Sequence, residues 1–418
     1  MTTFELASIL VSIAAVFGWI SSRWLKLPIT IGTMLLTVLC SLGLAVMSPF
    51  APALQPWALR LVQQINFESL ILHGMLSILL FAGAFLLDLE FLAREKLAVI
   101  SLSVFGTVLS TVAIAVIMWL VLPPIGIHAT WLQCLFFGAL ISPTDPIAVL
   151  EMLRRVGVPK NVTAQLAGES LFNDGVGAVI FLALLDASRG AVPVVSHIVL
   201  LTLAKVGGAL ALGVFAAWIT SSLMRLVNAY QVEILLTLAL ALGGYALADA
   251  LHLSAPLEAV AAAIALRRFN LNYAPALISH ESIDTFWEVI DEVQNSVLFV
   301  LLGLEVLAIP FRLASVKSGL AAVVAVNAVR LAVVAFILGV IRLFRRDHHT
   351  SILTLSWGGL RGGLSIALAL SVPVVQGRSW ILATTYVVVL FSIVIQGGSI
   401  DLFLRRFSQR PTQSALSR

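Results

Sequence analysis

The chain alternates between long apolar stretches and short polar connections. A helix needs about 20 apolar residues to cross the hydrocarbon core of a bilayer. Thirteen stretches reach or approach this length, at approximately residues 4–22, 27–48, 67–87, 97–121, 132–152, 162–186, 196–223, 232–250, 254–267, 285–308, 316–343, 351–372 and 380–403. The pattern predicts an all-α polytopic membrane protein of about 13 transmembrane helices, with connections too short for a soluble domain.

Two stretches depart from this simple pattern. The first has no basic leader segment and contains Glu5, so we expect a retained helix and not a cleaved signal peptide. The ninth is short, and Pro256 and Glu258 interrupt its start. Asp249 and Glu258 flank the break between the eighth and ninth stretches, where we expect both to face water.

Composition excludes several classes of protein. The chain is 60% apolar and 11% charged, whereas soluble domains carry roughly 45–50% apolar and about 25% charged residues. A cytosolic enzyme and a disordered chain are therefore excluded. The net charge of +4 is too small and too scattered for a nucleic-acid-binding surface. Cys40 and Cys134 lie inside apolar stretches and lack the CxxC spacing of a metal site.

The basic residues are distributed unevenly between the two sides of the predicted bundle. Seventeen of the 25 Lys and Arg residues fall in connections on one side, five fall on the other, and three lie within stretches. Cytoplasmic loops carry the excess of Lys and Arg. With an odd number of spans, this distribution predicts a cytoplasmic C-terminus and an external N-terminus.

Five ionisable residues lie deep within predicted spans. Each such group costs about 2.5–3.5 kcal/mol in hydrocarbon on insertion scales, so each needs a partner or a function. They are Asp145, Glu169, Asp174, Arg330 and Arg361. Three acids face only two bases, which leaves one acid for a cation or a proton.

The sixth stretch concentrates polar oxygens on one helix face. It reads Gly168-Glu-Ser-Leu-Phe-Asn-Asp-Gly175, in which Ser170 and Asp174 are four residues apart, as are Glu169 and Asn173. Side chains at this spacing stack on one stripe of a helix. Five or six oxygen ligands then suit a hard monovalent cation. The alternative is a polar face that packs helices through hydrogen bonds.

Two spans contain segments that disfavour a continuous helix. The fifth contains Ser142-Pro-Thr-Asp-Pro146, and the twelfth contains Gly358-Gly-Leu-Arg-Gly-Gly363. Proline removes backbone donors and biases the preceding residue away from helix. Broken helices in corresponding halves are typical of the substrate site of inverted-repeat transporters. The alternative is two kinks without a ligand role.

The positions of the breaks predict the internal organisation. The fifth and twelfth spans are seven apart, so residues of about 1–187 and about 232–405 would form two inverted repeats, joined by a linking helix at about 196–223. Residues 406–418 would form a short cytoplasmic tail. Where the broken helices cross, Asp145 would balance the positive ends of half-helices and Arg361 the negative ends.

These motifs together resemble the signatures of a known family. Ser142-Pro-Thr-Asp-Pro146, Glu169-Ser-Leu-Phe-Asn-Asp-Gly175 and Trp357-Gly-Gly-Leu-Arg-Gly-Gly-Leu364 are similar to those of the NhaP-type sodium/proton antiporters, in the electroneutral branch of the monovalent cation–proton antiporters. The resemblance covers nearly all of residues 1–405. It implies an NhaA/NhaP-like fold with two crossed, discontinuous helices, a homodimer, and a core domain that moves against a dimerisation domain.

The resemblance also implies roles for individual residues. Asp174 matches the carboxylate that binds either the cation or the proton, with Asn173 beside it. Ser170, Thr144 and Asp145 match the other ion-site positions. A monovalent cation would accordingly be held by Asp174, Asp145, Ser170 and Thr144.

Glu169 matches an acid that pairs with an arginine. Arg330 is the favoured partner. Arg361 is the alternative, although charge balance at the crossed helices is its favoured role. No catalytic residue and no resident cofactor are expected, because neither an HExxH nor a GxSxG motif occurs.

The expected function is secondary active antiport in a bacterial or archaeal plasma membrane, with cation and proton competing for Asp174. The cation is Na⁺, with Li⁺ or K⁺ left open, and the exchange is expected to be electroneutral and one for one. A K⁺/H⁺ antiporter and an ion-coupled symporter of organic solutes remain alternatives. Between His280 and Glu292, five acids predict either a cytoplasmic lip that attracts cations or simply the start of the tenth span.

Overall fold

A computed structural model describes most of the chain, and every element in it is helical. The described residues are 3–47, 70–145, 149–150, 153, 160–188, 195–227, 229–271, 277–308, 313–344, 351–373 and 377–400. They contain no β-strand. The chain is therefore an all-α protein throughout its described part, as the hydropathy pattern predicts.

The first half of the chain forms α-helices with short π-helical segments (η1 to η3) and one 3₁₀ turn (η4) between them. They are α1 (Thr3–Ile20), η1 (Ser21–Leu25), α2 (Ile29–Met47), η2 (Leu70–Met75), α5 (Leu76–Phe85), α6 (Leu89–Ile100), η3 (Ser101–Gly106), α7 (Thr107–Val121), η4 (Pro123–Ile125), α8 (Trp131–Ile141) and α10 (Lys160–Ser188).

The second half contains the longest helices and the sharpest break. Its elements are α11 (Val195–Met224), α12 (Tyr230–Ala250), α13 (Ala255–Leu271), α14 (Leu277–Glu305), η5 (Val306–Ala308), α15 (Leu313–Phe344), α16 (Ile352–Gly358), α17 (Gly363–Ser371), α18 (Arg378–Leu390) and η7 (Phe391–Gly397).

Within the described residues, each of the thirteen predicted stretches lies mainly in helix. Seven described helices are long and apolar enough to cross a membrane, or eight if α16 and α17, bent by 52°, form one span. The helices α2, α5 and α8 are apolar but shorter. The protein is thus a multi-pass membrane protein, while the count of thirteen spans and the inverted repeats stay predictions.

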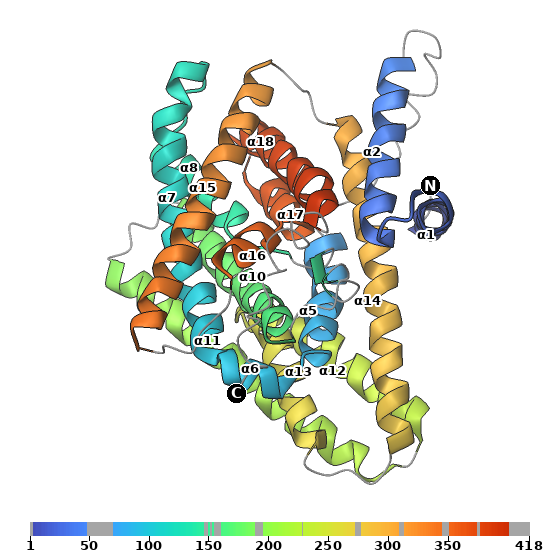
Figure 1. Cartoon of the computed structure of the whole chain (residues 1–418). Helices are drawn as coiled ribbons and strands as arrows, with labels where there is room; N and C mark the ends of the chain where they lie inside the picture. Colours follow the sequence, from blue (N-terminus) through green and yellow to red (C-terminus); the bar gives the residue numbers. More distant parts are fainter. Residues whose placement is uncertain are drawn as a thin grey trace, which may run out of the picture.

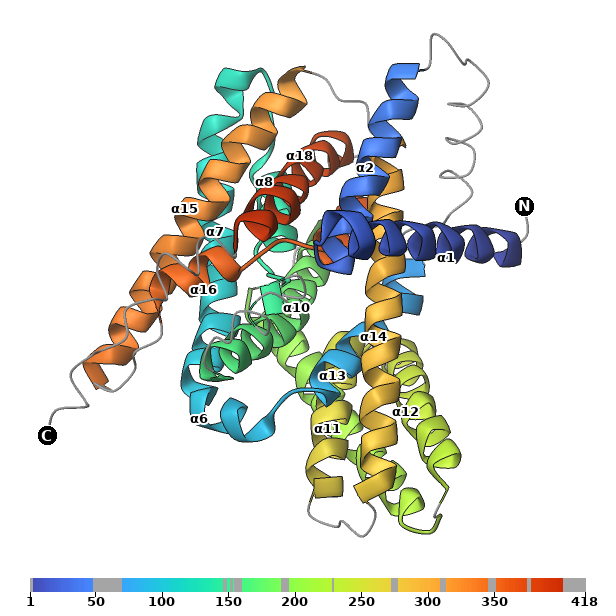
Figure 2. The same ribbon diagram turned by 45° about the vertical axis from the view of Figure 1, so that its right-hand side comes forward.

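The helices pack into two groups, as Figure 1 shows. In one group α2 packs on α14, and α13 packs on α5, α11 and α12. In the other, α7 packs on α8 and α15, α10 on α6 and α8, and α18 on α15 and α17. The two groups meet where α10 contacts α5 and α13 and where α14 contacts α17. In Figure 2, α1 lies across the first group, nearly at right angles to α14.

Local sequence explains several helix starts. The hydroxyl of Thr130 accepts from the backbone N–H of Gln133, whose side chain accepts in return from the Thr130 N–H, a capping box that begins α8. Asp88 caps α6 by accepting from the N–H groups of Glu90 and Phe91. Such caps satisfy backbone donors that lack partners in the first helical turn.

The prediction that Glu258 faces water is wrong. Its side chain is 0% exposed, and it packs between α13 and α12, against Gly244. Both carboxylate oxygens lack a hydrogen-bond partner within the described part of the chain. The sequence suggested exposure because Glu258 follows a helix break, but α13 turns this residue toward α12, where Gly244 has no side chain and leaves room for the carboxylate.

Candidate functional site

The fifth predicted span is interrupted where its prolines lie. Helix α8 ends at Ile141, residues 142–145 are not helical, and helix returns at 149–150. The hydroxyl of Ser142 donates to the Gly138 carbonyl and accepts from Thr111 of α7. The unwound segment is therefore fixed at its start, and it carries Thr144 and Asp145 into the protein interior.

The twelfth predicted span is interrupted too, and the two unwound segments meet. Residues 359–362 separate α16 from α17. The backbone N–H of Asp145 donates to the carbonyl of Leu360 at 2.8 Å. This bond satisfies one donor and one acceptor freed by the breaks, which irregular backbone within a membrane protein requires.

Charged side chains sit at the half-helix ends of this crossing. A guanidinium nitrogen of Arg361 donates to the Gly359 carbonyl at 3.0 Å, just beyond the C-terminal end of α16. The carboxylate of Asp145 lies against Gly362, the residue that caps the N-terminus of α17. Each charge is thus opposite in sign to the helix-dipole end beside it.

Gly362 leaves no space for a side chain. A methyl group on its Cα would overlap Oδ2 and Cγ of Asp145. Gly362→Ala is therefore expected to destabilise the protein by about 1–3 kcal/mol, as overpacking of a filled interior does, and to lower the thermal unfolding midpoint in detergent.

The matched control for that variant is Gly339→Ala on α15, where a methyl group would meet nothing within 4 Å. Alanine favours a helix interior by up to about 1 kcal/mol relative to glycine, so this variant should leave the midpoint unchanged or raise it. Equal effects of the two variants would contradict the tight contact at Gly362.

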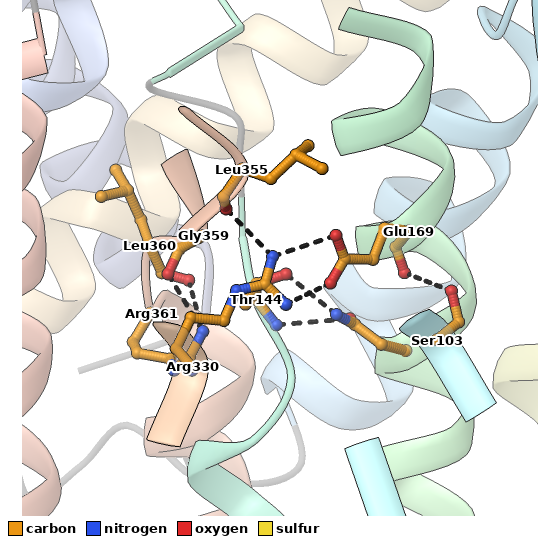
Figure 3. Close-up of polar contacts among 9 residues, drawn as sticks. Ser103, Thr144, Glu169, Arg330, Leu355, Gly359, Leu360 and Arg361 are labelled. Atoms are coloured by element: carbon orange, nitrogen blue, oxygen red, sulfur yellow. Dashed lines mark hydrogen bonds and ion pairs between the residues drawn. The ribbon is translucent and has the colours of Figure 1, made fainter. Parts of the chain in front are cut away.

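Glu169 forms a buried ion pair with Arg330. The two terminal guanidinium nitrogens of Arg330 each donate to one carboxylate oxygen of Glu169, Nη1 to Oε1, and Nη2 to Oε2 at 3.0 Å. The side chain of Glu169 is 1% exposed and that of Arg330 is 7% exposed. Arg330 also donates to the Leu355 carbonyl at 3.1 Å, and Figure 3 shows how these groups converge. Of the two arginines left open by the sequence, Arg330 is the one that pairs, so α10, α15 and α16 are joined at this point.

Asn173 and Thr144 hold the unwound segment against α10. The Asn173 amide donates to Thr144 Oγ1 at 2.9 Å, and its oxygen accepts from the Thr144 N–H at 3.3 Å. Both residues are buried, and neither lines the cavity described next. The geometry gives them a structural contact, and their direct role in binding an ion stays a prediction.

Asp174 opens onto a cavity of about 240 Å³ between the two helix groups. Asp145 and Ser170 line the same cavity. No hydrogen bond or ion pair to Asp174 occurs among the described residues, although the charges of Asp145 and Arg361 act on it with opposite sign. The Ser170 hydroxyl is buried and lacks a partner in the described structure. Three of the predicted ion-site residues therefore share one polar space.

The charge of this cavity is strongly one-sided. Four acids line it, two near the crossing and two from α14, namely Asp145, Asp174, Asp291 and Glu292. None of the described lining residues is a lysine or an arginine. A low-dielectric cavity lined by one sign of charge concentrates ions of the opposite sign, so the space suits a cation or a proton and repels an anion.

The structure adds polar residues from the first helix group, the one that contains α2 and α14, that the motifs did not indicate. Thr30 of α2 and Asn295 of α14 line the cavity and are 7% and 1% exposed. Neither belongs to a charged cluster or a proline-rich segment, so composition gave no signal for them. Asp291 lies within the acidic segment His280–Glu292, for which a cation-attracting lip was one of two interpretations.

Comparison with known proteins places the chain in a family. The family described as "Sodium/hydrogen exchanger, transmembrane" matches residues 11–406. The chain belongs to this family. The match covers the described helices from within α1 to η7, both unwound segments and the cavity.

Two Na⁺/H⁺ antiporters match nearly all of this chain. The Na⁺/H⁺ antiporter NhaP of Pseudomonas aeruginosa is 38% identical over 408 residues, covering 96% of each chain. NhaH of Halobacillus dabanensis, also a Na⁺/H⁺ antiporter, is 28% identical over 409 residues, again covering 96% of each. The structure of the sodium proton antiporter MjNhaP1 from Methanocaldococcus jannaschii superposes with a TM-score of 0.74, at 18% identity and over 97% of this chain and 99% of that one. This last likeness shows the fold.

Proposed function

We propose that this exchanger moves Na⁺ across the membrane in one direction and H⁺ in the other, with both binding at Asp174. The observation that carries the proposal is the cavity between the two helix groups, where Asp174 lies without an ion-pair partner among the described residues. The four acids and the absence of a described basic lining residue support a cationic substrate. The similarity to the Na⁺/H⁺ antiporters NhaP and NhaH supports Na⁺ as that cation.

Competition for one carboxylate explains coupling. A cation bound at Asp174, Asp145 and Ser170 replaces the proton that Asp174 would otherwise carry. The helix group that contains α10 moves against the helix group that contains α2 and α14 only when a cation or a proton neutralises Asp174. Each half-cycle then carries one substrate, so exchange is obligatory. Thr144 and Asn173 would position Asp145 and Asp174. Arg361 would balance the negative helix-dipole end where the two unwound segments cross.

The stoichiometry is inferred from Asp174, which has no ion-pair partner among the described residues. Glu169 is neutralised by Arg330 in both half-cycles, and Asn173 stands where a second acid would allow another proton. One cation therefore exchanges for one proton, and no net charge crosses. The protein would function as a homodimer in the plasma membrane, without a resident cofactor.

The cavity lies toward the basic side of the bundle. Thr30 follows the connection that contains Arg23 and Lys26, and Leu87 precedes Arg94 and Lys96. Since the side rich in Lys and Arg is cytoplasmic, the described conformation would open to the cytoplasm. The C-terminus would lie on the same side.

The proposal predicts exchange that is independent of membrane potential. Proteoliposomes loaded with a pH-sensitive dye and holding an imposed pH gradient should lose that gradient when Na⁺ is added. The rate should not change when the potential is clamped at different values with K⁺ and valinomycin. A series with Li⁺, Na⁺ and, in a separate experiment without the clamp, K⁺ measures selectivity.

The outcomes of this experiment separate the parts of the proposal. Strong voltage dependence would contradict one-for-one exchange but leave antiport intact. Loss of the pH gradient with K⁺ but not with Na⁺ would show that K⁺ is the transported cation. No gradient loss with any of the three cations would contradict cation–proton antiport by this protein.

A further inference from the structure

The cavity has a second polar wall, contributed by helices other than those that carry the family motifs. Asp291, Asn295 and Leu298 lie at positions i, i+4 and i+7 of α14, so they share one stripe of that helix, and all three line the cavity. Leu298 packs against Gly363, the first residue of α17. The stripe therefore reaches from the acidic segment of α14 to the crossing of the unwound segments.

Two neutral oxygens on this side are buried and unsatisfied. Oδ1 of Asn295 and Oγ1 of Thr30 have no hydrogen-bond partner in the described structure. Both residues line the cavity. Helix α5 contributes only leucines and a glycine to the same wall. Buried polar atoms nearly always have partners in native proteins, and each exception requires an explanation. Here the two exceptions border the space that contains Asp145, Ser170 and Asp174.

We propose that Thr30 and Asn295 are ligands of the transported cation, supplied by the α2 and α14 side of the cavity. The inference rests on the proposed function and deepens it. Hard monovalent cations favour several oxygen ligands, both charged and neutral. Asp145, Ser170 and Asp174 come from one helix group, and Thr30 and Asn295 complete the set from the other. Asp291 adds negative charge one helical turn away from Asn295.

This arrangement distinguishes a cation from a proton. A proton needs only one carboxylate oxygen, whereas a dehydrated cation gains from each further oxygen around it. Loss of Asn295 or Thr30 should therefore weaken cation binding and leave proton binding at Asp174 unchanged. A residue that only stabilises the fold would not produce this difference.

The test compares shape-conserving variants in proteoliposomes. Asn295→Leu and Thr30→Val remove the oxygens while keeping the approximate side-chain volume. Each should raise the KM for Na⁺ about tenfold, the effect of losing about 1.4 kcal/mol of binding. Because only cation binding changes, the ratio of variant to wild-type KM should be the same at every pH of a series. Asn295→Asp, which keeps an oxygen at that position, should retain the wild-type KM or lower it.

Ser296→Ala is the matched control. Ser296 lines the same cavity, but its hydroxyl donates to the Glu292 carbonyl of its own helix at 2.8 Å, so the variant should keep the wild-type KM. The inference is overturned if Asn295→Leu and Thr30→Val both keep the wild-type KM, if Asn295→Asp is as impaired as Asn295→Leu, or if Ser296→Ala shows the same loss. These results require an active wild-type exchanger, whereas failure of the proposed function would appear as an inactive wild type.

Discussion

Replacement of Asp174 by asparagine is expected to abolish cation–proton exchange. Proteoliposomes that contain Asp174→Asn should keep an imposed pH gradient after Na⁺ addition, as liposomes without protein do. Asparagine matches aspartate in size and still offers an oxygen, but it neither binds a proton nor carries the charge that attracts Na⁺. Since Asp174 has no ion-pair partner among the described residues, its replacement leaves no partner unsatisfied. The thermal unfolding midpoint should therefore not fall.

A second substitution on the same helix provides the control. Asp186 also lies on α10, but its side chain is 57% exposed and pairs with Lys205 at 3.3 Å. Asp186→Asn should retain exchange. Normal exchange by Asp174→Asn would remove Asp174 from its proposed role, and equal loss in both variants would point to a general effect of charge on α10.

The pattern of apolar residues predicted the helices and their breaks because both depend on local sequence. Proline disrupts the interior of a helix, as at Pro143 just after α8, and the glycines around Arg361 lower the preference for helix. The bond between Asp145 and Leu360 that joins the two breaks could not be read in this way, because it depends on how distant helices pack. Only the crossing of the two broken spans was expected, from the pattern of inverted-repeat transporters and from the resemblance to a family.

The charged residues show a similar division. The cost of an ionisable group in hydrocarbon indicated that each of the five buried groups needs a partner or a function. The resemblance implied that Glu169 pairs with an arginine and left Arg330 and Arg361 as candidates. Only packing selects Arg330. The same argument failed for Glu258, which is buried without a hydrogen-bond partner in the described structure. A neutral residue such as Asn295 gives no signal in the sequence, since one amide on a long helix has many ordinary positions.

Separating Glu169 from Arg330 is expected to have the largest effect on stability. Removing one partner of a buried ion pair leaves an uncompensated charge and costs about 3–5 kcal/mol. Glu169→Ala and Arg330→Ala should each lower the free energy of unfolding in mixed micelles by that amount. The double variant should be less impaired than the sum of the two, because it leaves neither charge alone.

Two further variants keep this prediction testable if the single alanine variants fail to fold. Glu169→Gln keeps the side-chain shape and one hydrogen bond to Arg330. Arg330→Lys keeps the positive charge but loses the bidentate contact with Glu169. Both should be less destabilised than the alanine variants. The exposed pair Asp186–Lys205, with side chains 57% and 43% exposed, is the control, and its double-mutant cycle should give less than about 1 kcal/mol of coupling.

The coupling energy decides whether this pair organises the site or only neutralises two charges. Arg330 also donates to the Leu355 carbonyl of α16, so loss of the pair loosens α10, α15 and α16, three helices that surround the crossing. Exchange by the double variant should therefore be impaired even though its stability partly recovers. Simple additivity would contradict the ion pair itself. Full recovery of both stability and exchange would show that the pair neutralises charge without positioning Asp145 and Asp174.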